Sequence, residues 1–449
     1  MSFFKKFTFP GGVHPQESKE LTAEKPIEPL GPPKIAYLPL AQHIGNPAQA
    51  LVKAGDTVGL GDLIGEASGF VSVPIHASVS GKVIAVENRL SPLGRKVPTI
   101  VIERDDQKEK DFPKIEFTAP ARKQEYQEGI CRAGIVGMGG ATFPTHVKLS
   151  PPPDKKIDTL IINGAECEPF LTCDYRIMLE RSEALLKGVM LMKSALSVEK
   201  VVIGIEKNKP QAIAKLRELS RESSIGIVEL EVKYPQGAEK QLIYATTKRE
   251  VPCGKLPMDV GIVVQNIGTA IAVYDYFYHA KPLIERVVTV SGPGIRQPKN
   301  LRVRIGTPIR ELIEFCGGLT EDTVKVINGG PMMGITLTNL DVPVIKGTSG
   351  IIALTAREAA IFAEQPCISC GHCVDVCPMN LLPTAIMKHT KKANWDEAQN
   401  QGALDCMECG SCAYVCPAKI NLVHYIRLCK AEVMQQKRQA SAKKGATNG

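Results

Sequence analysis

The sequence predicts a multidomain α/β protein, and three patterns along its 449 residues support that expectation. Residues 31–105 alternate short β-branched runs with glycine turns, as a small all-β unit does. Residues 116–281 alternate β-rich runs with stretches of helical periodicity, which indicates an α/β domain. Two copies of one four-cysteine pattern follow near the C-terminus. A chain of this length is expected to hold about two to four domains.

Composition and charge exclude several classes of protein. Hydrophobic residues make up 44% of the chain, enough for packed cores, and the net charge of +8 is modest. Only 5% of residues are aromatic and no basic–aromatic stripe appears, so we expect no nucleic-acid partner. No apolar run reaches the ~18 residues that span a bilayer, and the N-terminus lacks the apolar core of a signal peptide. We therefore expect a soluble protein of a reducing compartment, at most docked on a membrane.

Residues 1–30 form a polar N-terminal segment with four phenylalanines near its start, Phe3, Phe4, Phe7 and Phe9. These rings either dock on a partner or pin the segment to its own domain. Terminal segments are ordered only when something ties them down, so pinning is the favoured interpretation.

The all-β unit of residues 31–105 contains two similar runs, residues 52–64 and 71–83. They resemble the barrel-sandwich fold of biotinyl and lipoyl carrier domains. Such carriers bear their cofactor on a lysine at a hairpin tip. This chain has no lysine between Lys53 and Lys82 and places Phe70 at the tip. We therefore expect a lipoyl-like scaffold without the swinging arm.

Within residues 116–281, Thr159–Asn163 and Lys200–Ile205 are short apolar runs of the kind that form buried parallel strands. Residues 174–196 between them have helical periodicity, and a second helix is expected from Pro210, because proline suits a helix start. Three polar segments each follow a predicted strand, where α/β sheets bind ligands. These segments are residues 163–169, 234–240 and 265–269.

A glycine-rich segment, residues 134–148, stands at the head of this domain and contains Gly137, Gly139 and Gly140. Clustered glycines let backbone N–H groups approach a phosphate closely, and Lys148 adds a positive charge. Glycine clusters are also common in ordinary turns, so the segment alone leaves both interpretations open.

Residues 285–345 are β-rich again, with runs at 286–294 and 301–306 and a short helical stretch from Pro308. We favour a packing module here, with a ligand-binding role as the alternative.

The strongest signal is the pattern Cys-x-x-Cys-x-x-Cys-x-x-x-Cys-Pro, which begins once at Cys367 and once at Cys406. Two such copies are the ligand set of two [4Fe–4S] clusters, in which the fourth cysteine of each copy serves the other cluster. Zinc sites have no use for a third equally spaced cysteine, and disulfides are disfavoured without a secretory signal. The first cluster is expected on Cys367, Cys370, Cys373 and Cys416, and the second on Cys377, Cys406, Cys409 and Cys412. They would occupy a helical domain at 355–434, before a disordered tail at 435–449.

These motifs, taken in order, carry a family resemblance. The glycine segment and the three polar segments of residues 130–280 resemble the NADH-oxidising flavoprotein subunit of respiratory complex I. The whole chain, with its lysine-free barrel-sandwich in front and two clusters behind, resembles the C subunits of Rnf complexes (RnfC, also called RsxC). The resemblance implies a Rossmann-like α/β flavin/NADH domain, a β-grasp (SLBB-like) module at 285–345 and a helical ferredoxin-like two-cluster domain.

Matching the motifs residue by residue implies a set of sites. The phosphate of a non-covalent FMN would be held by Gly137, Gly139, Gly140 and Lys148. The flavin would be lined by Asn163, Glu166, Tyr234, Gly237, Glu239, Gln265, Asn266 and Thr269. The catalytic contacts to NADH would come from Glu168 and from Phe143, the latter by stacking. The chain departs from the complex I pattern at Met138, His146, Ala165 and Ala238.

The implied function is that of a peripheral subunit on the cytoplasmic face of the cell (inner) membrane. It would pass electrons between NADH, FMN and two [4Fe–4S] clusters within an ion-translocating NADH:ferredoxin oxidoreductase complex. Its partners would be integral membrane subunits and a ferredoxin-like subunit. A flavin suits this series because it accepts a hydride yet releases electrons singly. Two alternatives stay open: a cobalamin reductase of the propanediol-utilisation type, and a flavin-free electron wire.

Overall fold

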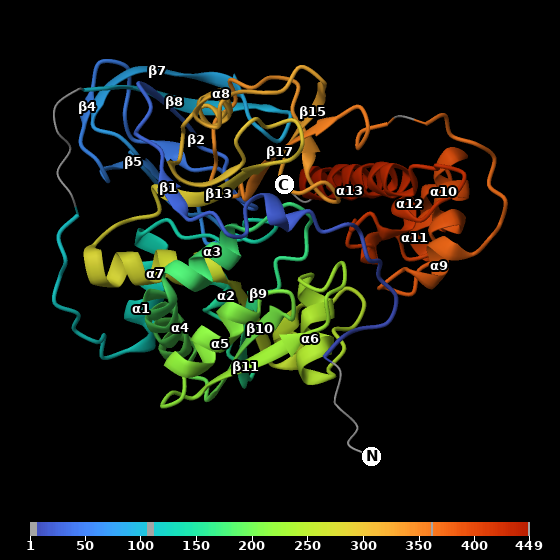
Figure 1. Cartoon of the computed structure of the whole chain (residues 1–449), viewed down its shortest axis with the longest axis horizontal. Helices are drawn as coiled ribbons and strands as arrows, with labels where there is room; N and C mark the ends of the chain where they lie inside the picture. Colours follow the sequence, from blue (N-terminus) through green and yellow to red (C-terminus); the bar gives the residue numbers. More distant parts are fainter. Residues whose placement is uncertain (1–6, 106–111, 361, 448–449) are drawn as a thin grey trace. The chain divides into compact units, whose positions relative to one another are not determined.

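The computed structural model describes residues 7–105, 112–360 and 362–447, with side chains as far as residue 440. Figure 1 shows the whole chain. The residues group into two compact units, which we call the cysteine unit and the sheet unit. The cysteine unit comprises Met1–Pro15, Glu231–Leu256 and Ala360–Gly449, and the sheet unit comprises Gln16–Leu230 and Pro257–Ala359. Phe3 and Phe4 lie outside the described residues.

The N-terminal part of the sheet unit is a pair of antiparallel sheets. One has the strand order β2–β8–β7–β4 and the other β3–β5–β6. Branched side chains from both sheets, such as Leu38, Ile64 and Ile100, are fully buried in one core. These sheets form the expected β sandwich. Their strands are β2 Ile35–Pro39, β3 Gln49–Ala50, β4 Thr57–Val58, β5 Leu63–Glu66, β6 Ile75–His76, β7 Gly81–Leu90 and β8 Lys96–Arg104.

A parallel four-stranded sheet with the order β11–β10–β9–β12 follows. The chain adds β10 and β11 on one side of β9 and then returns to add β12 on its other side. The strand order therefore reverses between β9 and β12, which makes this the point where such sheets bind ligands. The strands are β9 Thr159–Gly164, β10 Lys200–Glu206, β11 Ile225–Leu230 and β12 Ile262–Asn266.

Helices accompany the parallel sheet, and one prediction about them is wrong. The single helix expected over residues 174–196 is two helices that break at Arg181. The Arg181 guanidinium makes two hydrogen bonds to Asp275, of 2.6 and 3.1 Å, and the Ser182 hydroxyl donates to the Met178 carbonyl at 2.6 Å. The helices are α1 Lys123–Arg132, α2 Thr145–Lys148, α3 Cys173–Glu180, α4 Ser182–Leu196, α5 Pro210–Leu219 and α7 Ile267–His279, with a 3₁₀ turn η2 at Pro257–Val260.

The third part of the sheet unit is a mixed six-stranded sheet with the order β1–β14–β13–β17–β15–β16. Two of its strands come from outside the predicted range of 285–345: β1 belongs to the N-terminal segment, and β17 follows the range. Strand pairing over such sequence distances leaves no local signal in the sequence. The elements are η1 Lys19–Leu21, β1 Ile27–Pro29, β13 Glu285–Ser291, β14 Lys299–Arg304, α8 Ile309–Phe315, β15 Thr323–Asn328, β16 Ile335–Thr336 and β17 Gly350–Thr355.

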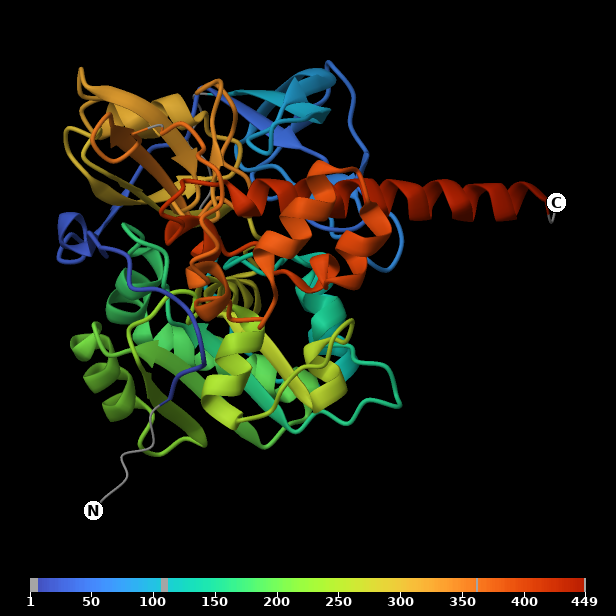
Figure 2. The same ribbon diagram turned by 90° about the vertical axis from the view of Figure 1, so that its right-hand side faces the viewer.

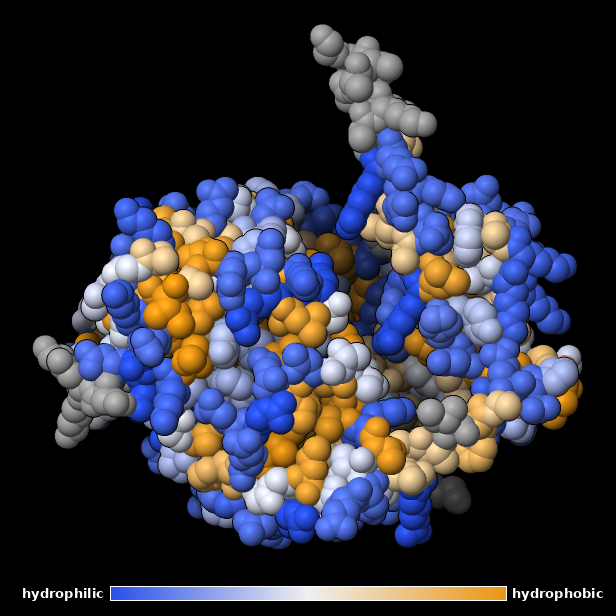
Figure 3. Space-filling model, turned by 90° about the horizontal axis from the view of Figure 1, so that it is seen from above, coloured by the Kyte–Doolittle hydropathy of each residue, from blue (hydrophilic) through white to orange (hydrophobic). Residues whose placement is uncertain are grey.

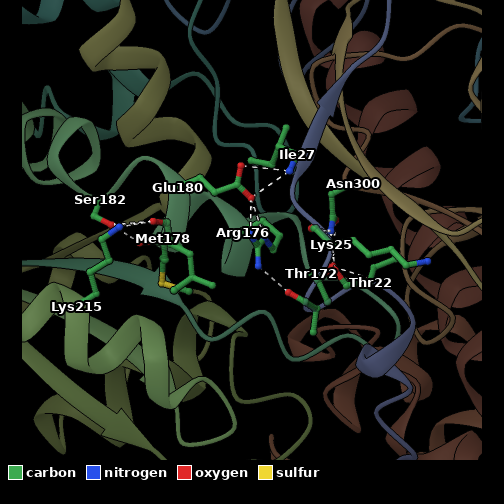
Figure 4. Close-up of polar contacts among 12 residues, drawn as sticks. Thr22, Lys25, Ile27, Thr172, Arg176, Met178, Glu180, Ser182, Lys215 and Asn300 are labelled. Atoms are coloured by element: carbon green, nitrogen blue, oxygen red, sulfur yellow. Dashed lines mark hydrogen bonds and ion pairs between the residues drawn. The ribbon is translucent and has the colours of Figure 1, made fainter.

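Polar contacts, of which those of Asn300 are buried, tie the N-terminal segment to the region of α3 and to the mixed sheet (Figure 4). The Asn300 amide accepts hydrogen bonds from the hydroxyls of Thr172 and Thr289, at 3.0 and 2.9 Å, and donates to the Thr22 carbonyl at 3.0 Å. The Glu180 carboxylate accepts from the backbone N–H of Ile27 at 3.0 Å. Residues 22–27 are therefore pinned to the sheet unit, and of the four rings expected to pin the segment, Phe9 is buried.

The cysteine unit is helical, and its C-terminal end differs from expectation. The tail predicted to be disordered from residue 435 instead continues the helix α13 to Thr447 (Figure 2). Alanine, lysine, glutamine and arginine, which dominate this stretch, are strong helix formers, and no proline interrupts them. The elements are α6 Glu239–Thr247, α9 His372–Asp375, α10 Pro383–Lys391, α11 Trp395–Asn400, η3 Ala403–Asp405, α12 Ser411–Tyr414 and α13 Leu422–Thr447.

No helix within the described residues combines the length and the apolar character needed to cross a bilayer. Figure 3 shows one face of the molecule, on which hydrophilic side chains separate the apolar ones into groups. Scattered exposed apolar side chains are usual on protein surfaces.

Replacing Asn300 with alanine should lower the free energy of unfolding by about 2–3 kcal/mol, because Thr172, Thr289 and Thr22 would lose a buried partner. Chemical denaturation followed by circular dichroism measures the loss. Asn339→Ala, at an exposed site of the same unit, is the control and should change the value by less than about 0.5 kcal/mol. Equal stability of the two variants would contradict the structural role of Asn300.

Candidate functional site

The carboxyl ends of β9 and β12 bring two candidate flavin-lining residues together. Asn163 and Asn266 are paired directly in the register of these two strands. Asn266 also accepts a hydrogen bond from the Gly268 N–H at 2.8 Å and so caps the start of α7. Its Nδ2 donates to Asp174 at 2.7 Å. The two asparagines therefore mark the point where the strand order reverses.

The glycine segment lies against this edge. A Cβ atom on Gly139 would come within 2.5 Å of Asn266 Nδ2, so only glycine fits there. The Thr269 hydroxyl accepts from the Met138 N–H at 3.0 Å and donates to the Val136 carbonyl at 3.2 Å. Thr269 thus holds the loop in place.

The tip of the glycine loop offers free donors. Gly139 and Gly140 are exposed, and their N–H groups have no hydrogen-bond partner within the described part of the chain. Space is open around the Cα of Gly140. The Gly137 N–H, in contrast, closes the loop by donating to the Phe143 carbonyl at 2.9 Å. Free N–H groups at an exposed glycine tip suit a phosphate.

Lys148 and Gln265 approach the same edge. The Lys148 ammonium donates to the Val264 carbonyl of β12 at 3.2 Å. The Gln265 side chain is 3% exposed, and both its oxygen and its nitrogen are buried without a partner among the described residues. A buried amide without a partner is costly, so a polar ligand group at this place would stabilise it.

Two lysines hold the loop after β9 by donating hydrogen bonds to its carbonyl groups. Lys19 donates to the carbonyls of Glu166, Glu168 and Leu171, at 2.8, 3.0 and 2.6 Å. Lys209, which is buried, donates to the Ala165 carbonyl at 2.7 Å. Neither lysine was singled out from the sequence, because each lies far from the loop along the chain.

Two carboxylates of this region have structural partners. Glu166 accepts from the N–H groups of Asp174 and Tyr175, at 2.7 and 3.2 Å, and so caps α3. The carboxylate of Glu168, the predicted NADH contact, accepts from the N–H groups of Met332 and Met333, at 3.0 and 2.9 Å. These bonds fix both side chains at the edge of the site.

Asp174 is a half-buried acid that the sequence analysis missed. Burial, together with the nearby charge of Glu166, raises the pKa of the Asp174 carboxyl to about 7. The carboxylate, the Cys173 thiol and Glu166 lie within 4.8 Å of one another. The helical periodicity of the sequence around position 174 does not indicate that Asp174 lies close to Glu166 and Cys173.

Phe143 is half-buried and contributes its carbonyl to the turn that closes the glycine loop. His146, three residues on, contacts the tip of the β sandwich. Its Nε2 lies 3.0 Å from the Phe70 carbonyl, and the two rings meet edge to face at 5.9 Å. Phe70, which stands where carrier domains have lysine, is 63% exposed and contacts His146 beside the loop.

The remaining candidates, Tyr234, Gly237 and Glu239, belong to the cysteine unit. Tyr234 is 1% exposed, and its hydroxyl donates to the Cys409 carbonyl at 2.7 Å. Gln236 beside it is fully buried, and its side-chain amide has no partner among the described residues. This amide is a further polar group that the sequence analysis missed.

The structure places the fourth cysteine of each motif with the first three of the other. A cavity of about 140 Å³ is lined by Cys367, Cys370, Cys373 and Cys416, with Lys388 at its wall. In the second group, burial and the adjacent thiols of Cys406, Cys409 and Cys377 raise the pKa of Cys412. Iron would displace the thiol protons, because metal-bound cysteine is a thiolate.

The two cysteine loops repeat the same backbone geometry. Ser369 and Glu408, each two residues after the first cysteine of a motif, have φ of 56° and 61°. Their N–H groups donate to the sulfurs of Cys367 and Cys406, at 3.4 and 3.3 Å. Hydrogen bonds to sulfur are one of the factors that set cluster potentials. Both loops therefore fit [4Fe–4S] clusters, just as the glycine tip, Lys148 and the unpartnered Gln265 amide of the sheet unit fit FMN.

Comparison with known proteins gives four family models that match successive parts of the chain. Residues 7–107 match the RnfC barrel sandwich hybrid domain, and residues 130–275 match the Nuo51 FMN-binding domain. Residues 287–336 match the SLBB domain, and residues 366–420 match the 4Fe-4S dicluster domain. The chain thus contains an FMN-binding domain and a domain for two [4Fe–4S] clusters.

Curated relatives match over nearly the whole chain. The C subunit of the proton-translocating ferredoxin:NAD(+) oxidoreductase complex of Clostridium ljungdahlii is 50% identical, over 95% of this chain and 94% of that protein. The C subunit of the Na(+)-translocating complex of Acetobacterium woodii is 48% identical, over 97% and 99%. The C subunit of the ion-translocating oxidoreductase complex of Rhodobacter capsulatus is 46% identical, over 96% and 84%. A solved NAD+-reducing [NiFe]-hydrogenase aligns with a TM-score of 0.49 and 18% identity, over 69% of this chain and 65% of that chain.

The raised pKa of Asp174 predicts a pH-dependent stability. The folded state favours the protonated carboxyl. The contribution of Asp174 to the free energy of unfolding is therefore fully present below the ordinary pKa of 3.8 and is lost as the pH rises through about 7. One proton changes the free energy of unfolding by at most about 1.4 kcal/mol per pH unit. Asp174→Asn should therefore lose less stability than wild type across this range. Thermal midpoints measured at several pH values test it, with Asp322→Asn, at an exposed site, as the control. Parallel profiles for wild type and Asp174→Asn would contradict the assignment.

Proposed function

The chain belongs to the family of C subunits of Rnf-type ion-translocating oxidoreductase complexes, and we propose that it passes electrons between NADH and partner subunits through FMN and two [4Fe–4S] clusters. The observation that carries the proposal is the edge between β9 and β12, where free glycine N–H groups and Lys148 lie near the unpartnered Gln265 amide. FMN supplies the conversion of a hydride into single electrons when it is bound there.

The chain's own residues hold and orient the reactants. We assign the FMN phosphate to Gly137, Gly139, Gly140 and Lys148. The flavin ring is assigned to Asn163, Glu166, Gln265, Asn266 and Thr269, together with Tyr234, Gly237 and Glu239. Glu168 and Phe143 are the proposed NADH contacts. The N–H groups of Met332 and Met333 keep the Glu168 carboxylate in one orientation, which supports a positioning role toward NADH.

Finer features of the family are also proposals for this chain. We assign the parallel sheet to the Rossmann-like class, because its strand order reverses beside β9, and the mixed sheet with α8 to the β-grasp class. The domain ranges are proposed as 31–105, 116–281, 285–345 and 355–434. We place the subunit peripherally on the cytoplasmic face of the cell membrane, beside integral membrane subunits and a ferredoxin-like subunit. The names of the relatives, which describe translocating complexes, support this placement.

Lys148→Ala is the sharpest test of the flavin assignment. The substitution removes a charge-assisted contact worth ~1.5–3 kcal/mol, so FMN affinity should fall by roughly 10- to 150-fold. Flavin should be lost on dilution while the iron and sulfide contents stay unchanged, and NADH should no longer bleach the cluster absorbance.

The control is Lys156→Ala, an exposed lysine of the same loop region outside the proposed site. It should retain FMN and NADH reduction. An anaerobic spectrum of wild type, supplied with FMN and then NADH, gives the reference. If wild type binds no FMN and NADH leaves the clusters oxidised, the proposed function fails.

Cys377→Ala tests the exchange of ligands between the motifs. Because Cys377 lies with the second group, its loss should damage the cluster of Cys406, Cys409 and Cys412 and spare the other. Electron paramagnetic resonance of the dithionite-reduced protein resolves the two clusters. Cys416→Ala is the matched variant and should damage the first cluster instead. Loss of the first cluster in Cys377→Ala would overturn the pairing.

A further inference from the structure

Lys346 is a lysine that lies in the core of the sheet unit. Its side chain is 1% exposed, and its Nζ donates hydrogen bonds to the carbonyls of Gly134 and Pro74, at 2.7 and 2.9 Å. Burial lowers the pKa of the Lys346 ammonium to about 7. A buried ammonium that bonds to carbonyl groups instead of a carboxylate retains much of its desolvation cost. Lys346 is therefore a candidate for a role beyond filling the core.

The partners of Lys346 belong to different parts of the sheet unit. Pro74 directly precedes β6 of the β sandwich, and Gly134 is the first residue of the glycine segment. Lys346 itself lies in the loop between β16 and β17 of the mixed sheet. Its backbone N–H donates to the side-chain oxygen of Gln42, a buried residue of the sandwich, at 3.0 Å. Lys346 therefore joins the sandwich, the glycine segment and the mixed sheet at one point.

The loop that contains Lys346 contacts the glycine segment at two further positions. The Lys346 carbonyl accepts a hydrogen bond from the Arg286 guanidinium, which also donates to the Met138 carbonyl at 3.3 Å. A Cβ atom on Gly347 would come within 2.5 Å of Thr142 Cγ2, so the chain after Lys346 lies directly against the segment. The exposed glycine tip lies between Met138 and Thr142. Both sides of the tip are therefore held from the loop of Lys346.

The fit around the Lys346 ammonium is close. Gly134 has a φ of 67°, and a Cβ atom there would come within 2.8 Å of Lys346 Nζ and 2.6 Å of the Pro74 carbonyl oxygen. It would also come within 3.3 Å of His76 Nδ1, which is buried without a partner among the described residues. Burial and the charge of Lys346 lower the pKa of His76 to about 3, so the imidazole stays neutral. The surroundings thus hold one positive charge and leave no room for a side chain at position 134.

We propose that Lys346 is a positioning residue for FMN: by holding Gly134 directly, and Met138 through its own carbonyl, it keeps the glycine tip in the conformation that receives the phosphate. This role rests on the proposed function. A loop that is already ordered binds its ligand at a smaller entropy cost than one that is ordered only on binding. The β sandwich, which has no lysine arm, contributes the Pro74 carbonyl to this arrangement. It thereby supports the flavin loop of its own chain.

Lys346→Met tests the role, because methionine fills a similar volume without the charge or the N–H donors. The full-length protein, loaded with both clusters and freed of flavin, is titrated with FMN, and quenching of flavin fluorescence gives the affinity. The affinity should fall by roughly 5- to 30-fold for each loop residue that must be ordered anew. Iron and sulfide contents should stay unchanged. Lys96→Met, the same substitution at an exposed site of β8, is the matched control and should bind FMN as wild type does.

Hydrogen exchange of the flavin-free protein separates positioning from a merely structural role. Lys346→Met should speed the exchange of amides 137–143 and leave that of β9 and β10 unchanged. The Gly137 N–H, which donates to the Phe143 carbonyl at 2.9 Å, reports on the closure of the loop. A lower thermal midpoint with unchanged loop exchange and unchanged FMN affinity would overturn the proposal, because Lys346 would then act on the core alone.

Gly134→Ala changes the same contact from the other side and leaves Lys346 in place. Its Cβ would displace the Pro74 carbonyl or the ammonium, so FMN affinity should fall here too. This variant decides the matter if Lys346→Met does not fold. Wild-type affinity in the folded variants overturns the positioning role alone, whereas a wild-type protein that binds no FMN overturns the proposed function and the positioning role with it.

Discussion

The side chain of Asn266 holds together the elements on which the candidate flavin site depends. It caps α7 through Gly268, bonds Asp174 at the start of α3, and lies close enough to the backbone of Gly139 to exclude any side chain there. Its position beside Asn163 is set by the register of two parallel strands. Changing this one amide would loosen a helix start, a neighbouring helix and the glycine loop at once. The parts of the candidate site are therefore linked to one another through a shared residue.

The sequence predicts well whatever is encoded locally. The doubled cysteine pattern is local, and so are the helix that starts at Pro210 and the strands on either side of α3 and α4. Contacts between distant segments leave no such signal. Lys19 holds the loop after β9 from some 150 positions away, and β17 enters the mixed sheet from beyond the predicted module. The prediction for the C-terminal tail fails for another reason: a composition rich in charge indicates disorder, whereas the same residues have high helix propensity.

Two residues that differ from the complex I pattern make specific contacts in this fold. His146 replaces a glycine of that pattern, and it is the residue that meets Phe70 of the β sandwich. Met138 replaces an arginine, and its carbonyl accepts a hydrogen bond from the fully buried guanidinium of Arg286 at 3.3 Å. The positive charge next to the glycine loop is therefore that of Arg286 in β13, and not that of a residue of the loop itself. The glycine loop of this chain is thus adapted to two neighbouring domains.

The contact between Phe70 and His146 also changes what a carrier-type domain contributes. In biotinyl and lipoyl domains the hairpin tip bears a mobile arm, and ordering that arm costs free energy each time it visits a site. Here the tip contacts His146 through the carbonyl and the ring of Phe70, so the free energy of ordering the tip is spent once, during folding. A fold associated with transport between sites thus contributes a fixed contact, through Phe70, to the region of His146.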